Sequence, residues 1–170
     1  MTNRKYEDEG KPEKALEIYE TLLARDDLTP VERRLANFNL GVIYHRQNDA
    51  PNGLKYWAEA ASPVSQSDPF VMAEENGLAA AANMNLGAHF VLTKDIEKGL
   101  RYLEKAVELD PEDGEIRFNL AATLAAQGRF EDAIREFQEA AERGVEIAKE
   151  VIKKIEAQMA ELEKKGNAKE

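Results

Sequence analysis

Apolar residues recur at helical spacing along most of the chain, with charged residues between them. No segment shows the strict alternation of apolar and polar residues that marks a half-buried strand. The pattern therefore predicts an all-α protein. The predicted helices span residues 12–26, 30–47, 51–61, 69–93, 96–109, 114–127, 130–143 and 145–165.

Capping signals support these starts. Thr29, Pro30 and Glu32 form the pattern of a capping box with proline at the first helical position. Asp68-Pro69 and Asp110-Pro111 repeat the order of a capping residue followed by proline. We expect these sites to cap the helices that follow them.

Three stretches of the chain are similar to one another at fixed offsets. Each contains an Asn-Leu pair followed by a small residue, and the leucines are Leu40, Leu86 and Leu120. The second offset is 34 residues, and the first is 46, which is the same period with 12 residues added. A fixed period of this length is typical of an array of identical helical units.

Small residues recur where paired helices should touch. A glycine inside a helix costs up to about 1 kcal/mol relative to alanine, so its repeated use predicts a close approach of two backbones. One set consists of Gly41, Gly87 and Ala121, and the other of Ala15, Gly53, Gly99 and Ala133.

Over residues 10–143 this pattern closely resembles the tetratricopeptide repeat (TPR) family. The resemblance implies an α-solenoid of antiparallel helix pairs, A and then B, in a right-handed superhelix. It makes residues 1–170 one domain. The units are a partial first repeat at 10–28, repeats at 30–61, 69–113 and 114–144, and a capping helix at 145–165.

Two departures from the family pattern stand out. The segment from Gly10 to Tyr19 matches a B helix whose A helix would begin before Met1, so we expect a truncated chain. The added residues lie between Ser62 and Ala79 and extend the next A helix. We expect that extension to pack against the preceding B helix, and a docking ledge for a partner is the alternative. Its apolar residues are Phe70, Val71, Met72 and Leu78.

After Gly144 the repeat ends and one amphipathic helix follows. We expect it to cover the apolar flank of the last repeat, because a repeat array needs a terminal element with a polar outer face. Its apolar stripe consists of Ala148, Val151, Ile152, Ile155, Met159 and Leu162.

The composition narrows the class of partner. With 33 acidic and 23 basic residues the formal charge is −10, which argues against a nucleic-acid partner because phosphate binding depends on Lys and Arg. The chain has no cysteine, hence no disulfide and no Cys-ligated zinc. Its polar start lacks a signal peptide, and no stretch is suited to membrane insertion. We expect a cytoplasmic protein that could lie peripherally on an organelle or membrane surface through a protein partner.

Catalytic groupings are scarce. His45 and His89 lie on different predicted helices, and the serines cluster at 62–67 with no adjacent histidine. A nucleophile therefore has no base beside it, and the histidines have no carboxylates at metal-ligand spacing. The sequence predicts no enzyme activity, no cofactor and no metal site.

The resemblance places a partner-binding groove on the A helices. This groove would be mostly apolar, with Asn39, Asn85 and Asn119 along it as donors and acceptors for a peptide backbone. These asparagines could equally bond to the adjacent helix. The groove positions are Leu35, Phe38, Asn39, Val42, His45, Ala81, Met84, Asn85, Ala88, Val91, Leu92, Glu115, Phe118, Asn119 and Ala122.

One subtype of the family grips the carboxyl terminus of chaperone tails with Lys and Asn, then Asn, then Lys and Arg on successive A helices. The matching positions here are Phe38 and Val42, then Asn85, then Glu115 and Asn119. Only the central asparagine agrees, so this chain is not expected to bind chaperone tails.

The sequence thus predicts a scaffold or adaptor that binds a peptide or helix of a partner in an apolar groove. An empty apolar groove would be an unusually large exposed patch, so self-assembly into a homo-oligomer is also expected. This small acidic chain also resembles magnetosome-associated repeat scaffolds, which coat an organelle membrane by self-assembly. The alternatives are RNA binding, as in pentatricopeptide proteins, and a regulatory module of a larger enzyme or of a secretion or chaperone complex.

Overall fold

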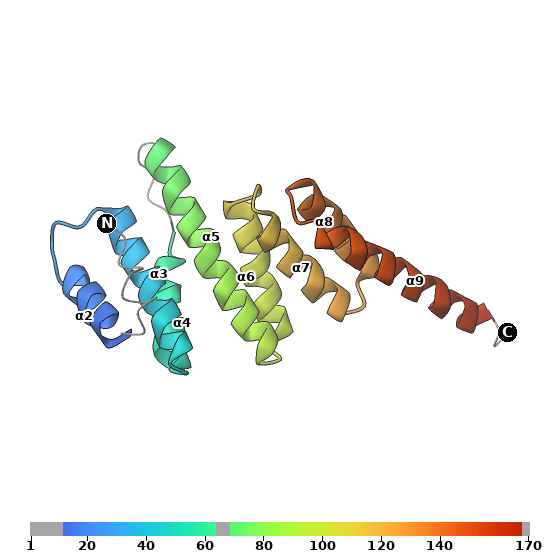
Figure 1. Cartoon of the computed structure of the whole chain (residues 1–170), viewed down its shortest axis with the longest axis horizontal. Helices are drawn as coiled ribbons and strands as arrows, with labels where there is room; N and C mark the ends of the chain where they lie inside the picture. Colours follow the sequence, from blue (N-terminus) through green and yellow to red (C-terminus); the bar gives the residue numbers. More distant parts are fainter. Residues whose placement is uncertain (1–11, 64–68, 168–170) are drawn as a thin grey trace. The chain divides into compact units, whose positions relative to one another are not determined.

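The computed structural model describes residues 12–63 and 69–167, and within those ranges every regular element is an α-helix (Figure 1). The all-α prediction is confirmed. The expected A helix before Met1, the loop at 64–67 and the Asp68 cap lie outside the described residues. The helices are α2 (Pro12–Leu23), α3 (Pro30–Arg46), α4 (Ala50–Ala60), α5 (Pro69–Leu92), α6 (Ile96–Leu109), α7 (Gly114–Ala126), α8 (Phe130–Glu142) and α9 (Ile147–Asn167).

The chain divides into two compact units, residues 1–86 and 87–170, and each is described by itself. The boundary falls inside α5. The first unit contains α2, α3, α4 and most of α5, and the second contains the end of α5 and α6 to α9.

The turns inside the helix pairs repeat one backbone geometry. Asn48, Lys94 and Gly128 each have a positive φ, of 61°, 68° and 75°. In each turn the next amide donates to a carbonyl five residues earlier, at 2.9, 2.8 and 3.0 Å. These positions are separated by 46 and 34 residues, so the period seen in the sequence is also the period of the backbone.

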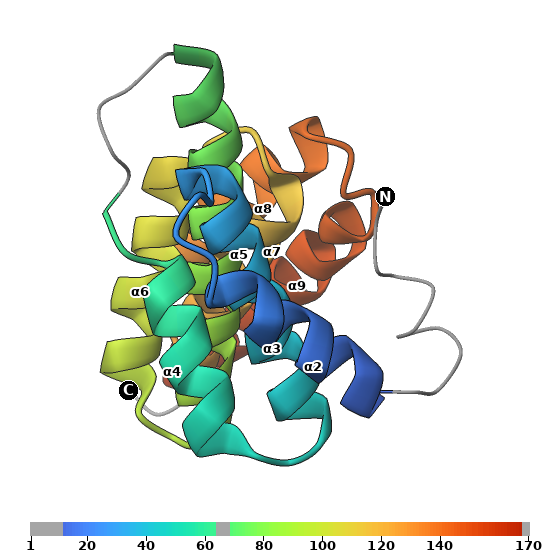
Figure 2. The same ribbon diagram turned by 90° about the vertical axis from the view of Figure 1, so that its left-hand side faces the viewer.

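In the first unit, α3 and α4 form an antiparallel pair, adjacent in both views (Figures 1 and 2). The indole ring of the buried Trp57 of α4 packs against Gly41 of α3. A methyl group at Gly41 would lie 2.3 Å from Trp57 Cδ1, and one at Gly53 would lie 3.3 Å from the Gly41 carbonyl. The predicted close approach of the two backbones is confirmed.

The second unit repeats this contact with smaller side chains. A methyl group at Gly87 would lie 2.7 Å from Leu103 Cγ, and one at Gly99 would lie 3.0 Å from the Gly87 carbonyl. In the next pair, formed by α7 and α8, Ala121 replaces the glycine, and Phe137 is buried at the position equivalent to Trp57 and Leu103.

Helix α2 packs on α3 through an apolar cluster that includes Ala15, Tyr19 and Leu40. At its edge the Tyr44 hydroxyl donates to Glu20 Oε1 at 2.9 Å. Burial, together with this bond to the carboxylate, raises the pKa of Tyr44 to about 12. The phenol therefore remains a neutral donor at physiological pH.

The helix starts confirm one prediction and correct another. Thr29 caps α3 in a reciprocal bond pair with Glu32, which confirms the capping box. Asp110 does not cap α7, so that capping prediction is wrong, whereas the predicted helix start at Gly114 is confirmed. Asp110 instead ends α6, and Asp113 caps α7 by accepting from two amides of its first turn, at 2.8 and 3.1 Å.

Helix α9 lies against α8 and buries Ala148 and Ile155, as predicted for a terminal cap. Leu162 is 53% exposed, so its predicted burial is wrong. The reason is length, because α9 has 21 residues and α8 only 13. At about 1.5 Å per residue, the end of α9 runs past its partner (Figure 1).

Helix α5 has 24 residues against 17 in α3 and 13 in α7, which confirms the extension of two to three turns. Its expected packing is wrong for Phe70, which is 88% exposed. The fully buried residue of the extension is Glu75. At about 100° per residue, Phe70 lies roughly 140° around the helix from Glu75 and faces another direction.

We predict that Gly41→Ala lowers the free energy of unfolding by about 1–3 kcal/mol, because the new methyl group overpacks the Trp57 site. Gly77→Ala is the matched control, since no described atom lies within 4 Å of a methyl group there. Gly77→Ala should be neutral or stabilising by up to about 1 kcal/mol. Urea unfolding followed by circular dichroism measures both, and equal stability of the two variants would contradict the close contact.

Candidate functional site

The predicted groove residues lie on α3, α5 and α7, and all of them are outside the core of their own unit. On α3 of the first unit, Leu35 and His45 are exposed, and Phe38, Asn39 and Val42 are partly buried. The buried residues of the same helix, such as Ala36 and Leu40, occupy the positions between them. Three predicted groove residues of α5 also belong to the first unit. They are Ala81, Met84 and Asn85, and all three are partly buried.

The remaining groove residues belong to the second unit. Ala88, Leu92, Glu115 and Ala122 are exposed, and Val91, Phe118 and Asn119 are partly buried. Leu92 is 77% exposed. Each unit therefore presents its predicted residues outside its core, which is the condition for a role in binding.

The second unit has a hollow of about 260 Å³ on α7, lined by Glu115, Phe118, Asn119 and Val145. Phe118 makes an edge contact with the buried Phe137, with ring centroids 5.1 Å apart. This contact fixes the position of the Phe118 ring. Three of the four lining residues are predicted groove residues, and Val145 was missed because it lies in the turn before α9.

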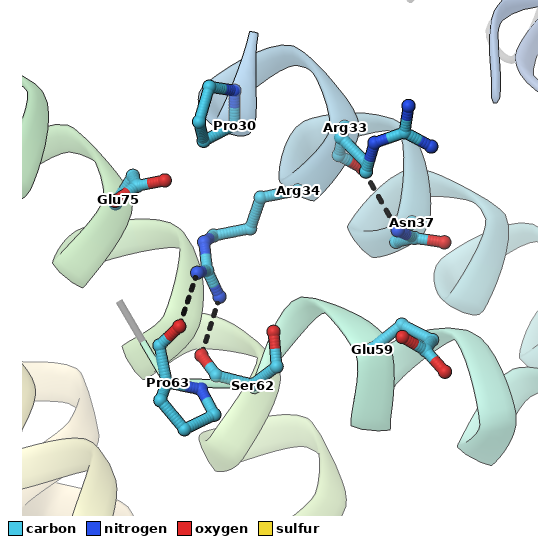
Figure 3. A pocket seen from close by; sticks show the side chains of 8 residues that line it. All are labelled: Pro30, Arg33, Arg34, Asn37, Glu59, Ser62, Pro63 and Glu75. Carbon is cyan, nitrogen blue, oxygen red and sulfur yellow. Dashed lines mark hydrogen bonds between the residues drawn. The ribbon is translucent and has the colours of Figure 1, made fainter. Parts of the chain in front are cut away.

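The first unit has a hollow of about 200 Å³ that the sequence did not predict (Figure 3). Three buried polar residues form its floor: Arg34, Asn37 and Glu75. The other lining residues are exposed and form the rim: Pro30, Arg33, Glu59, Ser62 and Pro63.

The Arg34 guanidinium donates hydrogen bonds to backbone carbonyls at the C-terminal end of α4. Its Nη1 donates to the carbonyl of Ala60 and to that of Ser62, the latter at 2.9 Å. Its Nη2 donates to the carbonyl of Pro63 at 3.3 Å (Figure 3). The guanidinium thus bonds to the carbonyl of the last α4 residue and to two carbonyls just beyond the helix, and all three acceptors are neutral.

The charge that balances Arg34 comes from Glu75. Burial lowers the pKa of Arg34, and the negative charge of Glu75 acts in the opposite direction. Neither oxygen of the fully buried Glu75 carboxylate, nor Arg34 Nε, has a hydrogen-bond partner among the described residues. Two opposite charges therefore share the hollow and keep unused hydrogen-bonding capacity.

Asn37 completes the floor. Its Nδ2 donates to the Arg33 carbonyl at 3.0 Å, within the same helix. The equivalent residue 46 positions later, Asn83, does the same to Ala79 at 2.8 Å. These buried asparagines differ from the predicted ladder of Asn39, Asn85 and Asn119, and sequence reasoning missed them.

A signal for Arg34 was present in the repeats. The equivalent positions hold Ala80 and Gly114, so arginine is the exception among three units. The backbone at Gly114 lies close to the carbonyl of Ala140, and a methyl group added at Gly114 would lie 3.1 Å from that oxygen. In the first unit the equivalent carbonyl, that of Ala60, binds the Arg34 guanidinium instead. An arginine where the other repeats have alanine or glycine was therefore a sequence signal for this site.

A search of the described helices finds none long and apolar enough to cross a membrane. Within residues 12–63 and 69–167, no group of three or more His, Cys, Asp or Glu side chains could hold a metal ion.

Comparison with known families accounts for the repeated geometry. Two family models described as tetratricopeptide repeat match residues 4–69 and 90–155. The chain belongs to the tetratricopeptide repeat family. The prediction made from the repeat pattern is confirmed, and the fold is the all-α solenoid type of that family.

Solved structures share the TPR fold at low sequence identity. The C-terminal TPR-containing domain of a Plasmodium falciparum protein described as FK506-binding matches with a TM-score of 0.65 and 16% identity, over 81% of this chain and 97% of that one. Two structures of MamA, titled AMB-1 and MSR-1, match with TM-scores of 0.63 and 0.61 at 19% and 20% identity. Each covers 94% of this chain, and 80% and 84% of the respective MamA chain.

One curated relative is closer in sequence but over a short stretch. Hsp70-Hsp90 organizing protein 1 of Glycine max is 43% identical over 54 residues. That stretch is 32% of this TPR chain and 9% of the soybean protein.

We predict that Arg34→Met lowers the free energy of unfolding by about 3–5 kcal/mol, because it leaves the Glu75 carboxylate buried without its counter-charge. The double variant Arg34→Met/Glu75→Met should recover part of that loss. Urea unfolding of the wild type, both single variants and the double variant gives a coupling energy, expected to exceed about 1 kcal/mol. Additive effects would show that the two charges do not compensate each other.

Proposed function

We propose that the chain is a scaffold or adaptor that binds a polypeptide segment of a partner on the outward faces of α3, α5 and α7. Membership of the TPR family supports a protein-interaction role. The specific surface is supported by the predicted groove residues, all of which lie outside the core of their unit. The apolar members would be covered on binding, and the hydrophobic effect would supply much of the affinity.

The polar residues of this surface suit a peptide ligand. Asn39, Asn85 and Asn119 are partly buried, which leaves part of each side chain accessible. An amide side chain both donates and accepts, as a peptide backbone does. We propose that the asparagines align the bound segment and that the apolar residues determine which side chains it carries.

The observation that carries the proposal is that each unit exposes a leucine among its predicted groove residues. Leu35 is 40% exposed and Leu92 is 77% exposed. Leu162, 53% exposed on α9, lies outside the groove and provides a matched control.

We predict that Leu35→Glu and Leu92→Glu each reduce partner capture at least tenfold, because a carboxylate placed in an apolar contact must lose its hydration. Leu162→Glu introduces the same charge on a comparably exposed leucine and should leave capture unchanged. The measurement is affinity capture from extracts of the source cells with quantitative mass spectrometry, after circular dichroism has shown equal helicity. Undiminished capture by both groove variants would refute the groove.

The identity of the captured proteins also distinguishes a free-standing scaffold from the main alternative function. A regulatory TPR module within a larger enzyme, or within a secretion or chaperone complex, would use the same kind of surface. Consistent recovery of subunits of one such assembly would favour that assignment over a free-standing scaffold.

We further propose that copies of the chain associate with one another, as expected for a repeat scaffold that coats a magnetosome. The exposed apolar residue Ile147 at the start of α9 would take part, at 59% exposure. Sedimentation equilibrium of the whole chain should give a mass above that of the monomer, and Ile147→Glu should shift it towards the monomer. A monomer at all concentrations would refute self-association.

A further inference from the structure

The hollow of the second unit belongs to the proposed groove, and its chemistry indicates what it takes from a partner. Its lining residues are Glu115, Phe118, Asn119 and Val145. Glu115 is exposed and the other three are partly buried, so a ligand can reach every one of them. The volume of about 260 Å³ is below the roughly 300–1,000 Å³ of sites that enclose a small molecule. The hollow therefore has the size for one side chain.

Two of the lining residues form apolar walls that are held in place. The Phe118 ring contacts the buried Phe137, with ring centroids 5.1 Å apart. Val145 lies against the backbone at Gly114, where an added methyl group would be 2.9 Å from Val145 Cγ2. Methylene groups packed on these two walls would leave water, and the hydrophobic effect would favour their entry.

The charge near the hollow is negative. Among the described residues of the second unit, no ion pair includes Glu115. The basic residues closest to it in sequence already have acidic partners. These pairs are Arg117 with Glu136, Arg143 with Glu112 and Glu139, and Lys149 with Glu146. Glu115 is thus left without a counter-charge, and complementarity calls for a cationic group at the end of an apolar stem.

We propose that this hollow binds an arginine side chain of the partner segment, an inference that rests on the proposed groove function. The aliphatic stem packs on Phe118 and Val145, and the guanidinium donates two parallel hydrogen bonds to the Glu115 carboxylate. Lysine carries its charge on a single nitrogen and cannot form that paired bond. A leucine would cover the walls but would give Glu115 no partner in exchange for lost hydration.

The first experiment is an NMR titration of the isotopically labelled whole chain with capped tripeptides, acetyl-Gly-Xaa-Gly-N-methylamide. The arginine peptide should give saturable shifts confined to the neighbourhood of Glu115, Phe118, Asn119 and Val145. The citrulline peptide keeps the shape but has no charge, and it should bind at least threefold more weakly. The peptide of 2-amino-3-guanidinopropionate keeps the charge on a shorter stem and should also bind at least threefold more weakly, as should the lysine peptide.

Each of the other results would overturn the proposal in a different way. Equal binding of the citrulline peptide would show that Glu115 contributes nothing. Equal binding of the short-stem peptide would reduce the site to a surface ion pair without the hollow. Lysine binding as tight as arginine would remove the paired bond, and no saturable shift with any peptide would remove the site.

A variant tests the carboxylate directly. Glu115→Gln keeps the shape of the side chain and should lower the affinity for the arginine peptide at least threefold, to that of the citrulline peptide. Glu131→Gln makes the same charge change at an exposed residue of α8 and should leave the affinity unchanged. Raising NaCl from about 20 to about 300 mM should weaken arginine binding to the wild type but not to Glu115→Gln, because salt screens exposed charges. Unchanged affinity in Glu115→Gln would refute the assignment.

Failure of this inference and failure of the groove proposal give different results. If Leu92→Glu loses partner capture while no arginine peptide binds, the groove stands and the arginine site is refuted. If the arginine peptide binds through Glu115 while both Leu35→Glu and Leu92→Glu retain capture, the arginine site stands and the wider groove is refuted.

Discussion

The structure depends on how closely the backbones of paired helices approach one another. At Gly41 and Gly87 the absence of a side chain brings the A helix into direct contact with Trp57 and Leu103 of its partner. Every other feature of a repeat follows from that distance, including which residues are buried and which A-helix residues remain outside. The contact recurs in both units, so the helix pairs of the two units share one backbone geometry although their surface residues differ.

Much of this architecture was readable from the sequence because it is periodic. The repeat offsets located the glycine contacts, and Thr29 with Glu32 identified the start of α3. Local patterns were less reliable where two signals competed. Asp110-Pro111 has the composition of a helix start, but Asp113 lies closer to the first turn of α7 and caps it. Leu162 belongs to an apolar stripe, yet stripe membership says nothing about the length of the neighbouring helix.

The first-unit hollow could not be derived in the same way. Glu75 lies in the residues added to the repeat, so no equivalent position predicts its burial. A glutamate on a helix is normally exposed, and only the fold brings it to the arginine of another helix. Arg34 was the one sequence signal for the hollow, since the equivalent positions of the other repeats hold a small residue. The predicted groove residues, by contrast, came from the resemblance to the TPR family, and in the structure they lie outside the core of their unit, unlike Ala36 and Leu40.

The bonds from Arg34 to the carbonyls of Ser62 and Pro63 also bear on how such an array can change during evolution. They secure the chain just beyond the last turn of α4, where the added residues begin. An insertion placed after a secured point does not loosen the hairpin that precedes it, and lengthening a connection costs only a fraction of a kcal/mol per few residues. Arginine at this position would therefore have made the first junction a tolerant place to acquire new sequence, whereas the junction at Gly114, closely packed against Ala140, has no such freedom.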